Sequence, residues 1–276
     1  SVSYQKYDKF KGPGSLEKYQ FNGKIYQPFG DRDFFSIGFH WNRNRNNAYR
    51  TLSTADIAGT TAIPNPLDTI RVYAPSVTNT YRYGVTASLI YRFGDNQAIR
   101  GSYTLDYGRH RQTGDGARFA GANYDIVDLF PHYNRVANIQ SLDGLTYRFR
   151  DRFSIAELNQ FSASYSGAFL DNQIKVDAGL RLPYFHRELN QYCYTQRGTS
   201  TAYCTTQVAS APNAEGYVTF AGSATQYLKP FTATRDYDKA LPAFGLSYRP
   251  DGGPHMVYAS FSQGLSAPRT DDLYTA

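Results

Sequence analysis

The chain has 276 residues, of which 16% are aromatic and 19% charged, and its formal net charge is +6. No run of about 20 apolar residues exists, which excludes a helical membrane protein, and a disordered chain would show more charge and fewer aromatic residues. The basic residues form no stripe or reading motif, so we expect no nucleic-acid partner. Their excess suits an ordinary mixed surface, or a surface or lumen that meets lipid phosphate or an anionic solute.

Period-two alternation is the dominant pattern along the chain. In residues 81–93 one face carries Tyr81, Tyr83, Val85, Ala87, Leu89, Tyr91 and Phe93, and the residues between them are mostly polar. Because successive strand residues point to opposite sides of a sheet, the segment predicts a strand with one apolar and one mostly polar face.

The same alternation predicts about nine strands in chain order. They cover residues 1–10, 18–29, 33–43, 81–93, 97–110, 156–170, 173–188, 239–250 and 255–268. Gly, Asp and Asn form short turns near residues 30, 95, 171 and 252, and such turns between alternating runs predict β-hairpins. The fold class predicted is therefore all-β, with an antiparallel up-and-down sheet.

Long loops alternate with these short turns, at about 43–80, 110–155 and 190–238. Loops of this length are rare in compact domains, and strict alternation with short turns places all of them at one end of the sheet. All of these features are typical of a transmembrane β-barrel with long extracellular loops and short periplasmic turns. We expect the apolar faces to meet lipid and the polar faces to line a wet or plugged lumen. In the alternative, a soluble carbohydrate-binding β-protein, the apolar faces would pack inside.

The two cysteines, Cys193 and Cys204, enclose a polar segment that contains a glycine. We expect a disulfide, which would stabilise the loop by roughly 3 kcal/mol in the chain-entropy model and place it in an oxidising compartment. Two free thiols are the alternative. A metal site is not expected, because only His186 lies nearby.

One segment near residue 260 carries a family motif. It reads aromatic-x-x-aromatic-Ser-x-Gly, then Pro, then an acidic residue, Leu and an aromatic residue. The matching positions are Tyr258, Phe261, Ser262, Gly264, Pro268, Asp272, Leu273 and Tyr274. This order and spacing resemble a barrel motif of TonB-dependent outer-membrane receptors, with a departure at Leu265, where an aromatic residue is usual. We expect the motif to be structural, because Gly264 permits a bend and Pro268 ends strand pairing.

The resemblance implies that residues 1–276 form part of a barrel of 22 strands around a plugged lumen, with the plug domain and the C-terminal strands absent. It implies active import of a scarce solute across the bacterial outer membrane, most commonly a ferric siderophore. Oligosaccharide and cobalamin are other substrates of the family, and a passive or substrate-specific porin is the alternative function. The implied partners are outer-membrane lipid and lipopolysaccharide, the TonB energy-coupling complex, and an extracellular small molecule such as a metal chelate.

Ligand contacts are expected from the long loops. Arg43, Arg45 and Tyr49 lie in the first loop, where guanidinium groups could pair with an anionic siderophore or Tyr could stack on a sugar. A solvated loop that meets lipopolysaccharide phosphate is the alternative. Tyr194 and Arg197, between the cysteines, form a second candidate set, with loop rigidity as the alternative role.

No catalytic or cofactor motif stands in the sequence. Gly-x-Ser-x-Gly, His-Glu-x-x-His and phosphate-binding glycine loops do not occur, and these are the patterns that hydrolases, metalloproteases and nucleotide-binding proteins use. The five histidines show no metal-ligand spacing. We therefore expect no enzyme activity, no metal site and no cofactor.

Overall fold

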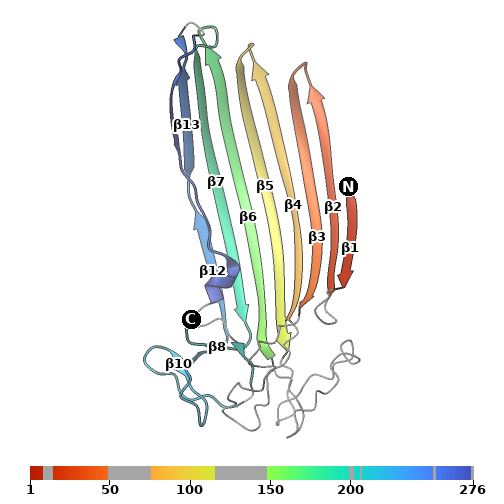
Figure 1. Cartoon of the computed structure of the whole chain (residues 1–276), viewed down its shortest axis with the longest axis vertical. Coiled ribbons are helices and arrows are strands. Elements are labelled where there is room, and N and C mark those ends of the chain that lie inside the picture. The colour runs from red at the N-terminus through yellow and green to blue at the C-terminus, as the bar shows by residue number, and fades with distance from the viewer. Residues whose placement is uncertain are drawn as a thin grey trace.

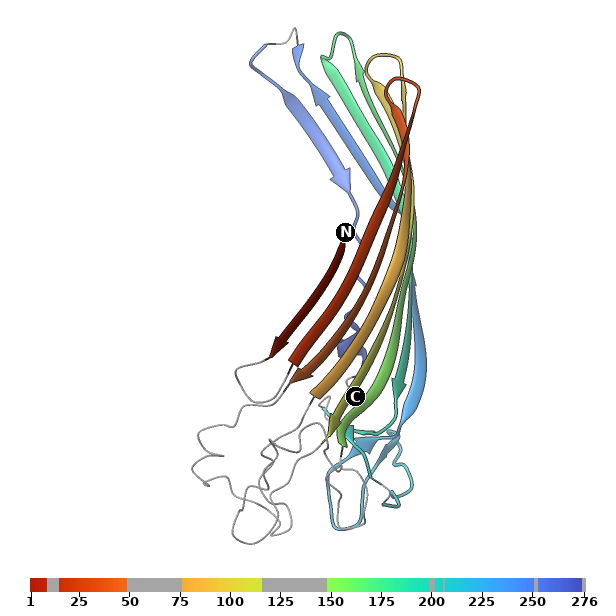
Figure 2. The same ribbon diagram turned by 90° about the vertical axis from the view of Figure 1, so that its right-hand side faces the viewer.

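The computed structural model describes residues 1–8, 15–48, 76–115, 148–198, 202–205, 207–250 and 253–274. Within these ranges ten strands form one curved antiparallel sheet (Figures 1 and 2). They are β1 (Val2–Asp8), β2 (Ser15–Phe29), β3 (Asp33–Ala48), β4 (Ser76–Phe93), β5 (Gln97–Asp115), β6 (Arg148–Phe169), β7 (Ile174–Gln191), β12 (Phe231–Asp238), β13 (Leu241–Tyr248) and β14 (Val257–Ser262). Neighbours in sequence are neighbours in space, so the predicted up-and-down sheet is confirmed.

The sheet has nine positions, because β12 and β13 share one beside β7. The register places the two residues between β12 and β13 opposite Leu182 and Pro183 of β7. Proline has no N–H to donate to a neighbouring strand, which explains the break in the ladder. The sequence prediction of a loop up to residue 238 is therefore wrong for β12, since its residues pair with Tyr184–Gln191 in the half of β7 that is nearer the long loops.

Several strands run further toward the loop end than the sequence predicts. β3 continues to Ala48, β5 to Asp115, and β6 starts at Arg148. In the extensions of β3 and β5 polar residues occupy both faces, so the alternation is missing there. In β6 Phe153 and Ile155 still alternate with polar residues, but Asp151 places a charge on their face. β14 is the opposite case, since it ends at Ser262, whereas the predicted strand continued to residue 268.

The turns between β2 and β3, β4 and β5, and β6 and β7 lie at one end of the sheet (Figure 1), here called the turn end; the opposite end is the loop end. Residues 251 and 252, at the fourth predicted turn, lie outside the described residues. Gly30 and Gly94 have φ values of 64° and 62° at two of these turns, in the left-handed region that glycine adopts without steric cost. The third turn uses Leu170, Asp171 and Asn172, with φ between 49° and 69°. The predicted positions of these turns are confirmed.

The two faces of the sheet differ as predicted. Apolar residues on the convex face include Phe39, Trp41, Tyr83, Val85, Leu89, Tyr103, Leu105, Phe161, Leu180, Leu182, Phe244 and Leu246. On β4 the aromatic residues Tyr83 and Phe93 are ten residues apart, or about 33 Å at the rise of a strand. At a tilt of about 40° this corresponds to a height of about 25 Å, the apolar band of a membrane barrel.

The concave face is polar and carries rows of small hydroxyl side chains. The Ser36 and Ser88 hydroxyls lie 2.9 Å apart, and those of Ser102 and Ser162 lie 2.6 Å apart. Each pair bridges two neighbouring strands, so the hydroxyls satisfy one another. A short 3-10 helix, η2 (Thr270–Tyr274), lies on this side of the sheet (Figure 2).

A second, smaller sheet lies at the loop end, built from very short strands. In spatial order they are β10 (Tyr217–Val218), β11 (Tyr227–Leu228), β8 (Tyr194–Gln196) and β9 (Ala202–Tyr203). None of the helical residues within the described ranges forms a segment long and apolar enough to span a membrane.

Replacing Leu89 by Arg tests which face meets hydrocarbon. Leu89 lies on the convex face near the middle of the apolar band, so Leu89→Arg should lower the free energy of unfolding in lipid by about 2–4 kcal/mol. Thr86→Arg, on the concave face of the same strand, should cost far less. Urea titration of the barrel refolded into lipid bilayers measures both; equal losses would contradict the sidedness.

Candidate ligand-binding site

A charged cluster occupies the concave face where β3, β4 and β5 lie side by side. Arg82 donates to both carboxylate oxygens of Asp106, at 2.7 Å from Nε to Oδ1 and 2.6 Å from Nη2 to Oδ2. His40 Nε2 lies 3.5 Å from Asp106 Oδ2. The Asp106 side chain is only 14% exposed, so these partners offset the cost of burying its charge.

Gly84 makes this arrangement possible. It lies on β4 between His40 and Asp106 in the register, and a Cβ built on it would lie 2.6 Å from His40 Cε1 and 2.6 Å from the Leu105 carbonyl oxygen. Any side chain at this position would push the imidazole away. The glycine therefore allows the His40 ring to cross its neighbouring strand toward Asp106.

A depression of about 360 Å³ adjoins the cluster on the inner wall. Arg82, Asp106, His110, Phe185 and Arg187 are among its lining residues. The Arg187 Nε is buried without a hydrogen-bond partner among the described residues, which is uncommon for a buried polar group. The size falls in the range typical of small-molecule sites.

The helix η2 borders the loop side of this depression through its first residue, Thr270, and its last residue, Tyr274, holds it to the wall. The Tyr274 hydroxyl lies 2.8 Å from Ser154 Oγ and 2.9 Å from the Phe153 carbonyl oxygen, and the Arg152 guanidinium lies 4.6 Å from the centre of its ring. Arg152 also bonds Asp271 at 2.8 Å. Burial raises the pKa of Tyr274, so its hydroxyl stays protonated and can donate to Phe153.

The family motif of the sequence is thereby placed in the structure. Tyr258, Phe261 and Ser262 lie on β14, and Asp272, Leu273 and Tyr274 lie on η2. Gly264 and Pro268 lie between the two elements, beyond the last paired residue of β14. Tyr274 is 1% exposed, so it anchors η2 to the wall.

Arg43 and Arg45 lie on the convex face, away from this depression. They alternate with inward residues of β3, on the same side as Trp41, and the Arg43 guanidinium lies 5.2 Å from the centre of the Tyr81 ring. The wall therefore does not bring them together with Arg82 or Arg187. Tyr49, the third candidate of that loop, lies outside the described residues.

Tyr194 and Arg197 lie in the small sheet at the loop end, where they make internal contacts. The Tyr194 ring packs edge-on against Phe220 at 4.9 Å between centroids. Arg197 lies over the Tyr217 ring at 4.6 Å and pairs with Glu215 at 2.8 Å. These contacts hold the loop in one conformation, and a contact of either residue with ligand stays a prediction.

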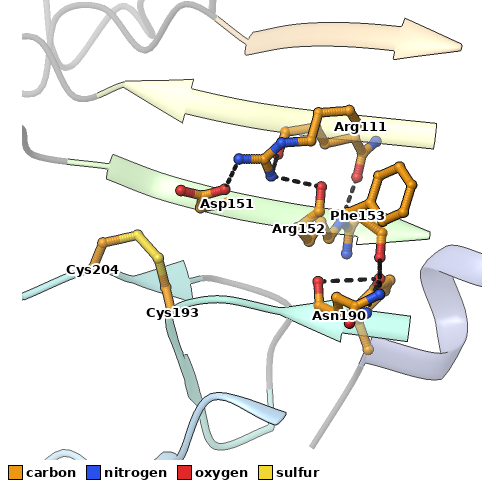
Figure 3. Close-up of polar contacts among 9 residues, drawn as sticks. Arg111, Asp151, Arg152, Phe153, Asn190, Cys193 and Cys204 are labelled. Atoms are coloured by element: carbon orange, nitrogen blue, oxygen red, sulfur yellow. Dashed lines mark hydrogen bonds and ion pairs between the residues drawn. A yellow bond between two sulfur atoms is a disulfide. The ribbon is translucent and has the colours of Figure 1, made fainter. Parts of the chain in front are cut away.

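The predicted disulfide between Cys193 and Cys204 is present. It lies beside the loop ends of β6 and β7 (Figure 3), where Asp151 pairs with Arg111 and the Tyr192 amide donates to the Asp151 carbonyl oxygen at 3.0 Å. The disulfide thus ties the small sheet to the wall.

Sequence reasoning missed the inner-wall residues that form the site. His40, Arg82 and Asp106 each lie on the polar face of an expected strand, but only the register between strands shows that they meet. The signal available in the sequence for these residues was a charged side chain at the centre of an expected strand, on its polar face.

Removing the disulfide should loosen the small sheet and spare the wall. In the double variant Cys193→Ser and Cys204→Ser, amides of residues 194–197 and 217–228 should exchange with solvent about 100-fold faster, since about 3 kcal/mol of local stability is lost. Hydrogen–deuterium exchange by mass spectrometry measures this, and amides of β4 and β5 serve as the internal control. Unchanged protection of the small sheet would show that its aromatic cluster suffices without the disulfide.

Comparison with known proteins places the chain in a family. Residues 2–276 match the family model described as TonB dependent receptor-like, beta-barrel. No curated protein sequence matches the chain. Solved structures similar to it include the ferric-catecholate import receptor Fiu from E. coli K12 in its open form, with 11% identity, a TM-score of 0.46, and coverage of 90% of this chain and 35% of that one.

Two further solved structures are similar to the chain at comparable sequence identity. The siderophore receptor PiuA from Acinetobacter baumannii has 12% identity and a TM-score of 0.43, over 86% of this chain and 30% of that one. A double mutant of the Serratia marcescens hemophore receptor HasR, in complex with HasA and heme, has 12% identity and a TM-score of 0.35, over 95% and 35%. The chain spans about a third of the length of these proteins. By the match of its sequence to the family model, this chain belongs to the TonB-dependent receptors and forms part of their β-barrel.

Proposed function

We propose that this chain is part of the wall of a TonB-dependent transporter that imports an anionic ferric siderophore across the bacterial outer membrane. The family supports active import and a location in the outer membrane, with a plug inside the barrel that couples to TonB. Members of the family are transporters, which agrees with the absence of catalytic motifs in the sequence. The observation that carries the choice of an anionic solute is the depression on the inner wall beside Arg82 and Arg187.

The charges around the depression favour an anion. Arg82 uses Nε and Nη2 for Asp106, which leaves its Nη1 for a ligand, and the Nε of Arg187 has no partner among the described residues. The lining contains three arginines, since Arg109 joins these two, and two carboxylates, Asp106 and Glu157. A bound anion would balance the remaining positive charge. Catecholate oxygens on iron are anionic and match the donor fork of a guanidinium.

The position of the depression fits a path for solute. It lies on the concave face, at the boundary of the apolar band that faces the loop end, and η2 borders it toward the loop end. A solute that enters from the loop end would meet these arginines on the wall of the lumen. The loop residues Tyr49, Tyr194 and Arg197 remain proposed contacts closer to the entrance.

The double variant Arg82→Gln and Arg187→Gln of the full-length receptor tests this function. Each lost charge-assisted hydrogen bond is worth about 1.5–3 kcal/mol, so the loss of two should lower the affinity for a ferric tricatecholate by at least about 100-fold. A ferric trihydroxamate without net charge should be affected much less. Equilibrium binding of each complex to the purified receptor measures the difference.

The control for that experiment is Arg32→Gln at the turn end, where Arg32 donates to the Gly94 carbonyl oxygen at 2.7 Å. It should leave binding unchanged. Uptake that persists in cells without TonB would favour a passive porin, and an unchanged affinity in the double variant would show that the solute is not held by these arginines.

A further inference from the structure

Two strips of opposite charge lie side by side on the convex face, on the loop side of the apolar band. The basic strip covers β3 to β5, and the acidic strip covers β6, β7 and β12. Neighbouring strands lie about 4.8 Å apart, so each strip is about 10 Å wide. The members of the basic strip are Arg43, Arg45, Arg109 and Arg111, and those of the acidic strip are Glu157, Glu188, Asp236 and Asp238.

The register places both strips on the convex face. The row that contains Tyr107 of β5 continues through Glu157 and His186 to Asp236. Arg109 lies one outward step beyond Tyr107, and its guanidinium lies 5.6 Å from the centre of that ring. The wall is a single layer of strands, so Arg109 and Glu157 also border the depression on its inner side. The two strips meet at the boundary between β5 and β6.

Both strips begin just beyond the apolar band. On β3 and β5 the first arginine of this face follows the outermost aromatic residue, Trp41 or Tyr107, by two residues. On β7 the outermost aromatic residue of the face is Tyr184, and Glu188 lies two outward positions further. Aromatic residues mark the boundary between hydrocarbon and headgroups. The charges of both strips therefore lie at the depth of the headgroups, where neighbouring barrels can touch.

Internal contacts neutralise only part of each strip. Arg111 pairs with Asp151. At the outer edge of the basic strip, Glu17 of β2 and Lys6 of β1 lie opposite each other in the register, so their charges cancel. In the acidic strip, Glu188 accepts a hydrogen bond from the neutral amide of Asn190 at 2.8 Å. The basic strip keeps a net positive charge and the acidic strip a net negative one.

Hydrocarbon gives apolar walls little reason to associate, because lipid tails are as apolar as the side chains that they cover. Charged groups at the depth of the headgroups therefore select which face of a barrel meets a neighbour. A neighbour that fits this face must present acidic groups to β3–β5 and basic groups to β6, β7 and β12. A second copy of the chain carries both, at the same depth in the membrane.

We propose that two copies of the receptor associate side by side through a two-fold axis along the membrane normal, near the boundary between β5 and β6. Copies inserted in the same direction can be related by rotation about the normal, and a half-turn exchanges left and right. The basic strip of each copy then faces the acidic strip of the other, so both contacts form at once and the pair is closed. The inference rests on the membrane location proposed above and not on the identity of the solute.

The test measures energy transfer between donor-labelled and acceptor-labelled copies of the full-length receptor in phosphatidylcholine bilayers, which carry no net charge. One variant reverses the basic strip by Arg43→Glu and Arg45→Glu, and the other reverses the acidic strip by Glu188→Arg and Asp238→Arg. Like charges then face each other, so each variant alone should associate at least about tenfold more weakly than the wild type. Heat-dependent migration on gels confirms that each variant is folded.

An equimolar mixture of the two variants is the decisive measurement. Both reversed strips then face opposite charges again, so the variants should associate with each other as strongly as wild-type copies do. The matched control is Arg100→Glu with Lys175→Glu, two reversals on the concave face. It changes the net charge as much as the first variant does and should associate like the wild type.

Three outcomes would overturn the inference. A wild type that stays monomeric, or a mixture whose association is not restored, would show that the strips do not meet. Assemblies that grow beyond two copies would exclude the two-fold axis. Siderophore binding, measured in parallel, should be unchanged in both reversed variants, so failure of this inference can be told from failure of the proposed function.

Discussion

The structure depends on one constraint, the pairing of every backbone N–H and C=O group within the apolar band. No water is available there, and each unpaired group would cost several kcal/mol. The strands β3 to β6 meet this requirement on both edges, in a continuous antiparallel ladder with 14 to 19 residue pairs between neighbouring strands. The alternation of apolar and polar side chains follows from this pairing. Neighbouring strands occupy both edges, so the side chains of a strand meet lipid on one face and the lumen on the other.

That constraint explains how much of the fold could be predicted from the sequence. Alternation from Tyr81 to Phe93 and the glycines at residues 30 and 94 are local signals, so strand cores and turns were predictable. Beyond the apolar band both faces meet water, so polar residues occupy both faces at the end of β5 and Asp151 interrupts the apolar face of β6. The extensions of these two strands were therefore not predicted. The strand β12 was missed for the same reason, since its residues Phe231–Asp238 carry charge on both faces.

The candidate site shows where local signals end. Cys193 and Cys204 are close in sequence, and their bond was predictable from composition. His40, Arg82 and Asp106 come from three strands and meet only because of the register, which a single sequence does not specify. Arg43 and Arg45 were predicted as ligand contacts, and the number of residues between them and Trp41 already places all three on the same face of a strand. This even spacing would have predicted that Arg43 and Arg45 lie on the face of the strand that meets the membrane.

The contact of Tyr274 with Ser154 has a consequence for how the chain assembles. The two residues are 120 positions apart, whereas the hairpins of the sheet join strands across turns of a few residues. Contacts over long separations carry a larger loop-closure entropy and form late. The helix η2 should therefore dock after β6 and β7 have paired. Its docking is then a final step that requires the correct register between those two strands.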